Sequence, residues 1–177
     1  MSVNIIYLKK WKSPLGELYL YSSKTHLLGL LFKNDEKTFL KHYPNHQMRQ
    51  ESTKITEKAI LQLKEYFAGK RKKFNLKMHL AGTEFQKKVW TALNQIPYGN
   101  TCSYKEQAQC VSSKNAGNKS GSKLGNLARA VGSANGKNPI AIIVPCHRVI
   151  GANGKLVGYA SGLKIKSELL KLEGFLK

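Results

Sequence analysis

Hydrophobic periodicity changes part-way along this chain, and that change restricts the fold more than any other feature. In the first third, apolar and polar residues alternate in three short β-rich runs, "NIIYLKKW", "GELYLYSS" and "HLLGLLFK". This alternation is typical of half-buried strands. Beyond about residue 52, apolar residues instead recur at helical spacing. The sequence therefore predicts an α+β fold, with the strands grouped before most of the helices.

The first part of the chain reads as a small domain of residues 1–80. Turn signals at Pro14–Gly16 and in "SSKTH" separate the three runs, which predicts an antiparallel meander. A helix is expected within residues 52–68, with Ser52 or Thr53 as its N-cap and Gly69 closing it. Its apolar positions recur every fourth residue: Ile55, Ala59, Leu63 and Phe67. The prediction is an antiparallel sheet covered by one helix.

Capped helices dominate residues 81–177, which read as a second domain. Thr83 with Gln86, and Ser103 with Glu106, form capping boxes in which each side chain satisfies a free backbone N–H of the other residue. A third helix is expected from near Asn126 to before Gly136, and a last one through "LKIKSELLKLEG". Between them, "IAIIV" predicts a buried strand and "GANGKLVGYASG" a glycine-rich connection. The polar stretch "SSKNAGNKSGSK" predicts a loop before the third helix.

Two short helices joined by a turn, over about residues 103–135, favour a helix-turn-helix. The second helix is built from small residues that leave one side nearly bare: Ala128, Ala130, Gly132, Ser133 and Ala134. Such a face allows close approach to another surface, or else ordinary tight packing against a neighbouring helix. Arg129 on the same helix favours the first interpretation.

A strong positive charge indicates a polyanionic partner. The chain has 30 Lys+Arg against 10 Asp+Glu, a net charge of +20 and an isoelectric point near 10.0. Residues 1–83 hold 16 of these basic and 6 of these acidic residues, so each half carries about +10 and the excess is not confined to a tail. A field of this size attracts and steers polyanions. A general lysine bias of the source proteome is the alternative explanation.

Cysteine usage and hydropathy restrict the compartment. The three cysteines, Cys102, Cys110 and Cys146, form neither a disulfide framework nor a zinc-ligand spacing, so we expect reduced thiols and no metal or other cofactor. No apolar run is long enough to span a membrane, and the N-terminus does not have the pattern of a signal peptide. A cytoplasmic protein is expected.

The chemistry-bearing motif is Pro145-Cys146-His147-Arg148, which follows the apolar run. A cysteine nucleophile requires its thiolate, and a neighbouring base or cation favours that form. Because adjacent residues of an extended segment point to opposite sides, His147 serves Cys146 only if the chain bends or a water intervenes. Glu173 is the carboxylate best suited to orient the imidazole, which gives a hypothetical Cys–His–Glu relay. A small buried cysteine beside an unremarkable histidine is the alternative.

Four ordered blocks resemble one family. The segments "FQKKVWTALNQIPYGNTCSY", "ARAVGSANGKNP", "PCHRVIG" and "GYASGLKIKSELLKLEG" resemble the methylated-DNA–protein-cysteine methyltransferases, also called O6-alkylguanine-DNA alkyltransferases. The resemblance runs from Gly82 to Gly174, and "SPLGELYL" extends it more loosely to the N-terminal region. It implies a small α/β N-terminal domain, 1–80, followed by a winged-helix-like DNA-binding domain, 81–177.

The resemblance also implies a reaction without a cofactor. A monomer binds duplex DNA, flips an O6-alkylguanine (or O4-methylthymine) out of the stack, and moves the alkyl group irreversibly to its own cysteine. Carried over by position, Cys146 is the acceptor, His147 removes its proton through a water, and Glu173 holds the imidazole. Four further residues would bind DNA or substrate. Arg129 would fill the space of the flipped base, Tyr104 would rotate the nucleotide, Asn138 would tie the helix-turn-helix to the active-site segment, and Tyr159 would stabilise the departing guanine. The helix carrying Arg129 would enter the minor groove.

Two departures from the family pattern bear on DNA binding and on the pocket. The connection before the Arg129 helix is roughly ten residues longer than usual, a cheap insertion, and its Lys114, Lys119 and Lys123 are candidate phosphate contacts. Ala160-Ser161 stands where relatives often carry Ser-Gly or Gly-Gly, which makes Ser161 a candidate pocket residue. Two other functions remain open on the sequence, a non-enzymatic module that recognises alkylated DNA and a cysteine hydrolase using Cys146 and His147.

Overall fold

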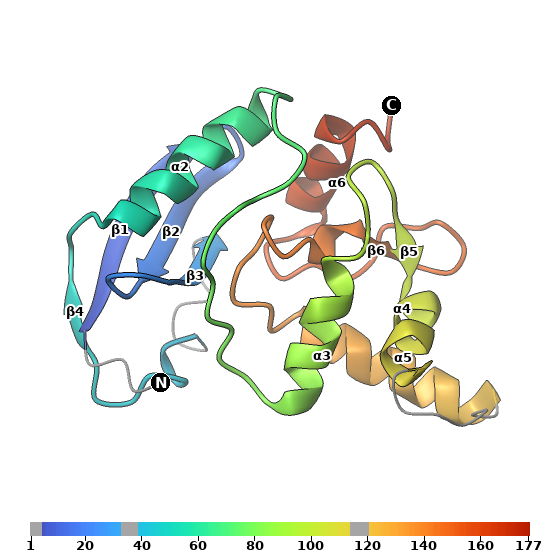
Figure 1. Cartoon of the computed structure of the whole chain (residues 1–177). Helices are drawn as coiled ribbons and strands as arrows, with labels where there is room; N and C mark the ends of the chain where they lie inside the picture. The colour runs from blue at the N-terminus through green and yellow to red at the C-terminus, as the bar shows by residue number, and fades with distance from the viewer. Residues whose placement is uncertain (1–4, 33–38, 114–120) are drawn as a thin grey trace. The chain divides into compact units, whose positions relative to one another are not determined.

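The computed structural model of the chain describes residues 5–32, 39–113 and 121–177, without the side chains of residues 113 and 121–124. The predicted α+β class is confirmed (Figure 1), with a sheet-based part and a helical part. Two compact units emerge. The first comprises Met1–Ala81 and Pro139–Ile143, and the second Gly82–Asn138 and Val144–Lys177. They are described separately below.

The sheet of the first unit has the strand order β3-β2-β1-β4. Strands β1 (Ile5–Ser13), β2 (Gly16–Ser22) and β3 (Leu27–Phe32) form the predicted antiparallel meander. Strand β4 (Gln47–Arg49) pairs with β1 in parallel, and the sequence did not predict it. Its three residues are all exposed, so the strand has no buried face and leaves no alternating pattern.

Helix α2 (Lys54–Phe67) packs against β1, β2 and β3, across one face of the sheet (Figure 1). Its predicted cap is confirmed, because the Thr53 side chain accepts the N–H of Thr56 and Thr56 Oγ1 accepts the N–H of Thr53. Gly69 follows the helix in the left-handed region at φ 72°, which favours glycine. Ile55, Ala59 and Leu63 are buried as their spacing predicted.

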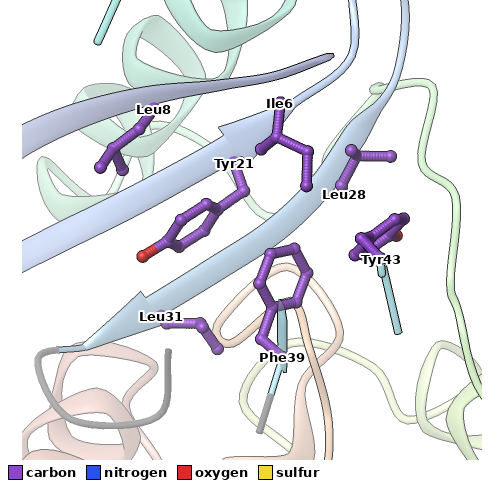
Figure 2. Close-up of a cluster of buried hydrophobic side chains, with 7 residues drawn as sticks. All are labelled: Ile6, Leu8, Tyr21, Leu28, Leu31, Phe39 and Tyr43. Carbon is purple, nitrogen blue, oxygen red and sulfur yellow. The ribbon is translucent and has the colours of Figure 1, made fainter. Parts of the chain in front are cut away.

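The opposite face of the sheet carries an aromatic cluster (Figure 2). Figure 2 shows side chains of the strands meeting Phe39 and Tyr43 from the segment after β3: Ile6, Leu8, Tyr21, Leu28 and Leu31. The ring centroid of Phe39 lies 4.7 Å from that of Tyr21 and 5.2 Å from that of Tyr43. A Cβ atom at Gly29 would stand 2.8 Å from the Phe39 ring. Glycine at this position therefore lets the aromatic ring reach the sheet.

Three helices form the framework of the second unit: α3 (Glu84–Leu93), α4 (Tyr104–Ser113) and α5 (Gly121–Asn135). Both predicted capping boxes are present, Thr83 with Gln86 and Ser103 with Glu106. Buried side-chain hydrogen bonds join the helices at 2.7–3.2 Å, because Gln107 and Asn135 bond reciprocally and Gln107 also donates to the Val89 carbonyl. The predicted helix pair α4–α5 is thus fixed by amide side chains as well as by apolar packing.

The predicted bounds of the loop between α4 and α5 are wrong at both ends, because each helix extends into the predicted loop. Helix α4 continues through Ser113 and α5 starts at Gly121, five residues before the predicted start at Asn126. Glycine and serine disfavour helix only weakly, and the fold overrides that preference here. Residues 114–120, with Lys114 and Lys119, lie outside the described residues, as does the side chain of Lys123.

The predicted strand "IAIIV" is also wrong. Residues 141–144 form turns, and only Ile140 pairs, in an isolated bridge with Leu30 of β3. The run is apolar because Ile140–Val144 are buried, and burial alone does not distinguish a strand from an irregular core segment. Two tight turns break it, with N–H to O=C bonds from Ile143 to Ala141 (2.7 Å) and from Cys146 to Val144 (2.9 Å).

The remaining elements of the second unit contain or follow the motif Pro145-Cys146-His147-Arg148, or contact it. Residues Cys146–Arg148 form a 3₁₀ helix, η1, which leads into β6 (Val149–Ile150). Strand β6 pairs in parallel with β5 (Cys102–Ser103), which directly precedes α4. Helix α6 (Leu163–Leu172) contacts η1 and confirms the predicted last helix.

Candidate active site

Cys146 is presented by a bend in the chain. Pro145, at φ −85° and ψ 63°, is the central residue of the turn closed by the Cys146 N–H. The motif then continues as a single 3₁₀ turn, so Cys146 and His147 do not alternate as they would in a strand. This is the bend that the sequence required if His147 was to act near Cys146.

The Cys146 sulfur is buried and hydrogen-bonded. Cys146 is only 8% exposed. Asn138 Nδ2 lies 3.1 Å from Cys146 Sγ and donates to the Val144 carbonyl at 2.8 Å. Burial raises the pKa of the thiol, while the Asn138 hydrogen bond and the positive charge of Lys166 lower it. A thiol in this setting is protected from solvent and requires help to ionise. Asn138 thus links the segment after α5 to the cysteine.

A buried carboxylate organises the two residues after the cysteine. Glu173, the C-cap of α6, accepts from His147 Nε2 at 2.9 Å, from Arg148 Nε at 2.8 Å and Nη2 at 2.9 Å, and from the Gly99 N–H at 3.3 Å. Burial raises the pKa of the carboxyl, but the hydrogen bonds from His147 and Arg148 and the charge of Arg148 help to lower it to about 2. Glu173 is therefore an anion at neutral pH, held by a two-pronged guanidinium contact.

This arrangement fixes the tautomer of His147. Because Nε2 faces the Glu173 carboxylate, it carries the proton, and Nδ1 is the nitrogen with the free lone pair. Nδ1 is buried and has no hydrogen-bond partner among the described residues. Burial lowers the pKa of the imidazole, although Glu173 opposes the effect, so His147 is neutral near pH 7. The ring can accept a proton at Nδ1.

Tyr104 and the glycine-rich connection form a second part of the site. Tyr104 Oη donates to the carbonyls of Val157 and Gly158, 3.2 Å from each. Gly158 has a φ of 57°, and a Cβ there would lie 2.7 Å from Tyr104 Oη. The next residue, Tyr159, is half-buried with its hydroxyl in the interior, and Ser161 is half-buried as well.

Arg129 stands apart from these contacts. It lies on α5 with its side chain exposed, and Nη1 donates to Asn126 Oδ1 on the same helix at 3.2 Å. Hydrogen bonds thus join Cys146 with Asn138, and His147 with Glu173, whereas the side chain of Arg129 is exposed to solvent. An exposed guanidinium on a helix of small residues is free to meet an external ligand.

Two residues of this site were missed by sequence reasoning. Lys166 is fully buried, and its Nζ donates to the carbonyls of Val149, Val157 and Gly158. Its position in the sequence could have revealed its burial, because residues 166, 169, 170 and 173 share one helical face. A lysine on such a face is unusual, since lysine rarely occupies a core position. The second is Gly99, whose backbone N–H reaches Glu173 from a turn far away in the sequence. Nothing local marked it.

Metal-binding clusters and membrane-spanning helices are both absent from the described residues. No group of three or more His, Cys, Asp or Glu side chains in them is arranged to hold a metal ion. Among the helices of this part of the chain, none is long and apolar enough to cross a membrane.

Comparison with known proteins gives a consistent result. Residues 84–175 match the family model "6-O-methylguanine DNA methyltransferase, DNA binding domain", and residues 6–80 match "6-O-methylguanine DNA methyltransferase, ribonuclease-like domain". The methylated-DNA–protein-cysteine methyltransferase of Methanosarcina acetivorans is 48% identical over 169 residues, 96% of this chain and 99% of that protein. The protein of that name from Mycobacterium leprae is 42% identical, over 96% and 93% of the two chains.

A solved structure agrees with this result. The Mycobacterium tuberculosis OGT in complex with DNA has a TM-score of 0.75 and 40% identity, covering 94% of this chain and 92% of that one. Family models cover both parts of the chain, and relatives match over nearly its whole length. The chain therefore belongs to the 6-O-methylguanine DNA methyltransferase family.

Proposed function

We propose that this protein is a methylated-DNA–protein-cysteine methyltransferase, which repairs DNA by transferring the alkyl group of O6-alkylguanine to Cys146. The observation that carries this proposal is the pair of hydrogen-bonded groups at the motif, Asn138 with Cys146, and His147 and Arg148 with the buried Glu173. Relatives that carry this activity in their names match nearly the whole chain. O4-methylthymine is the second substrate that we propose.

His147 acts as the base in the proposed mechanism. A water between Sγ and Nδ1 carries the proton from Cys146 to the imidazole, and the Glu173 carboxylate stabilises the imidazolium that forms. Arg148 keeps Glu173 ionised and in place. The thiolate then attacks the alkyl carbon. The S–C bond forms as the C–O6 bond breaks, which leaves a thioether on the protein and a guanine anion whose charge is shared between O6 and N1. A proton taken up at N1 then gives the unmodified guanine.

Substrate binding uses the exposed face of the second unit. Residues 81–177 form the alkyltransferase domain in this proposal, and residues 1–80 the N-terminal domain. Arg129 enters the duplex and takes the place of the flipped base, while Tyr104 and Tyr159 line the pocket that receives it, with Ser161 and Asn138 beside them. The net charge of +20 supports binding to a polyanion. Lysine and arginine side chains that neutralise DNA phosphates release the counterions bound there, and this release favours binding. We propose a cytoplasmic monomer that acts once, because nothing in the mechanism restores the thiol.

Intact mass spectrometry tests the proposal. The protein is incubated with a duplex containing a single O6-methylguanine, and peptide mapping then locates the added mass. The expected result is one methyl group on Cys146, no further turnover with excess DNA, and no transfer to the Cys146→Ala variant. Binding without labelling would identify a recognition module instead, and repeated turnover would identify a hydrolase. Either result would overturn the proposal.

A further inference from the structure

Tyr98 is a half-buried residue that the mechanism above does not use, and its hydroxyl reaches the end of α6. The last carbonyls of a helix need partners from outside the regular helix. In α6, the carbonyls of residues 169–171 accept the N–H groups of residues 173–175. The carbonyl of Leu172 accepts instead from Tyr98 Oη at 2.9 Å. Tyr98 therefore anchors the residue directly before Glu173.

The ring of Tyr98 also faces the guanidinium of Arg148. The guanidinium carbon lies 5.8 Å from the ring centroid, within the range of a cation–π contact. Two residues before Tyr98, the Ile96 carbonyl accepts from Arg148 Nη1 at 2.7 Å. The other two guanidinium nitrogens donate to Glu173. The segment around Tyr98 therefore holds both partners of the buried ion pair.

Gly99, the next residue, makes a further contact with the carboxylate. Its N–H donates to Glu173 Oε2 at 3.3 Å, and Arg148 Nε donates to the same oxygen. The other oxygen, Oε1, accepts from His147 Nε2. A Cβ at Gly99 would stand 3.0 Å from the backbone oxygen of Glu173, and the φ of 75° also favours glycine. The contacts of residues 96–99 thus determine which carboxylate oxygen faces the imidazole.

The Tyr98 hydroxyl keeps its proton at neutral pH. Burial raises its pKa, and the charge of Glu173 raises it further, against the opposing charge of Arg148. The hydroxyl is therefore a constant donor to the end of α6 in the pH range where His147 is neutral.

We propose that Tyr98 is a positioning residue that anchors the end of α6 and the Arg148 guanidinium, and so aims one oxygen of Glu173 at His147 Nε2. The proposal deepens the proposed function and rests on His147 being the base that serves Cys146. The bond from Nε2 to the carboxylate orients the ring and leaves the Nδ1 lone pair available for the proton. Tyr98 thus acts through other side chains and touches no reacting atom.

The first test observes the His147 ring by NMR, without DNA, in protein labelled with ¹⁵N-histidine. The wild type is compared with Tyr98→Phe and Tyr98→Leu, and His147→Asn identifies the His147 signals. Tyr19→Phe is the matched control, because Tyr19 Oη donates to Glu17 Oε2 at 2.7 Å and Lys10 Nζ lies 5.1 Å from its ring centroid. These contacts lie in the first unit.

We expect the Nε2 proton of His147 to respond to the loss of Tyr98. In Tyr98→Leu its signal should move upfield, and its exchange with water should be about tenfold faster or more, because the bond to Glu173 opens more often. Tyr98→Phe keeps the ring over the guanidinium, so its change should be smaller. The signal of Tyr19→Phe should coincide with that of the wild type.

The second test measures the single-turnover rate of methyl transfer from an O6-methylguanine duplex. Tyr98→Phe should be slower by about fivefold, the equivalent of one hydrogen bond of ordinary strength. Tyr98→Leu should be slower by about tenfold or more, since small displacements of a positioned group are costly. Tyr19→Phe should react at the wild-type rate.

The two tests together distinguish positioning from a general structural role. Slower transfer with an unchanged Nε2 proton signal would overturn the proposal, and so would Tyr98 variants that match Tyr19→Phe in both measurements. If Tyr98→Leu does not fold, Tyr98→Phe alone decides by the same two measurements. A wild type that transfers no methyl group would refute the proposed function, while the Nε2 proton signal still decides whether Tyr98 positions Glu173.

Discussion

Glu173→Gln is the sharpest perturbation of the buried charge cluster in the second unit. The carboxylate accepts four hydrogen bonds, three of them from His147 and Arg148 at 2.8–2.9 Å and one from the Gly99 N–H at 3.3 Å. Glutamine keeps the shape but replaces one acceptor oxygen by an NH₂ group. That group would face donors, and the guanidinium of Arg148 would be left without its buried counter-charge.

The magnitude follows from two separate arguments. The carboxyl has a pKa of about 2 in the folded protein against an ordinary value of 4.5. At neutral pH this difference corresponds to about 3 kcal/mol of stability, since a tenfold change in proton affinity is worth about 1.4 kcal/mol. Removing one partner of a buried ion pair typically costs about 3–5 kcal/mol. We therefore expect Glu173→Gln to lower the free energy of unfolding by about 3–5 kcal/mol.

Urea denaturation at pH 7.5 measures this loss, with Glu168→Gln as the matched control. Glu168 lies on the same helix and pairs with Lys171 at 3.2 Å on the surface, where such pairs contribute about 0–1 kcal/mol. A loss below about 1 kcal/mol for Glu173→Gln, the range of surface pairs, would refute the reasoning.

The pH dependence gives an independent check. A carboxyl whose folded pKa is lowered contributes its full stability above pH 4.5 and loses it as the pH falls from there to about 2. The wild type should therefore lose stability over that interval more steeply than Glu173→Gln. Parallel curves for the two proteins would contradict the assignment of the low pKa to Glu173.

Two further pairs of variants test the proposed pocket and the proposed DNA contact of α5. Gly158→Ala should slow methyl transfer about tenfold or more, because its Cβ would lie 2.7 Å from Tyr104 Oη and misplacing a substrate-binding group by about 1 Å can be that costly. Gly154→Ala, which has a similar positive φ of 77° but open space around it, should leave the transfer rate nearly unchanged, and equal slowing of both variants would exclude the steric explanation. Arg129→Ala should change the free energy of unfolding by less than about 0.5 kcal/mol, as expected for an exposed side chain, yet abolish efficient transfer from duplex DNA. Arg129→Lys should restore little of that transfer, because lysine lacks the planar group that stacks on bases, and full restoration would reduce the role of Arg129 to its charge.

Local chemistry made much of the fold predictable. The capping boxes of Thr83 and Ser103 and the cap of α2 at Thr53 depend on residues three positions apart, so the sequence contains all of the information. The strands β1–β3 were predictable for a related reason, since their partners follow along the chain through short turns.

The segment before the cysteine shows where such reasoning stops. Residues Ile140–Val144 are apolar and, except for Ala141, β-branched. They nevertheless turn twice, and Ile142 adopts a φ of 67° that is rare for a β-branched residue. Burial selects these residue types whether or not a neighbouring strand exists. The long-range partners of the site were equally hidden, because the contacts of Gly99 with Glu173 and of Lys166 with Val149 join distant parts of the sequence. Only Lys166, a lysine on an apolar helical face, left a detectable sign.

Burial is the larger effect on Cys146 and favours the thiol, while the Asn138 hydrogen bond and the charge of Lys166 favour the thiolate. Before ionisation, Arg148 and Glu173 cancel, His147 is neutral, and Lys166 leaves one net positive charge in the interior. When the proton of Cys146 moves to His147, a thiolate and an imidazolium form together and the interior keeps one net positive charge. The charge of Lys166 favours the thiolate and so opposes the burial that raises the thiol pKa. Charges arranged in advance for the reactive state cost little reorganisation during the reaction.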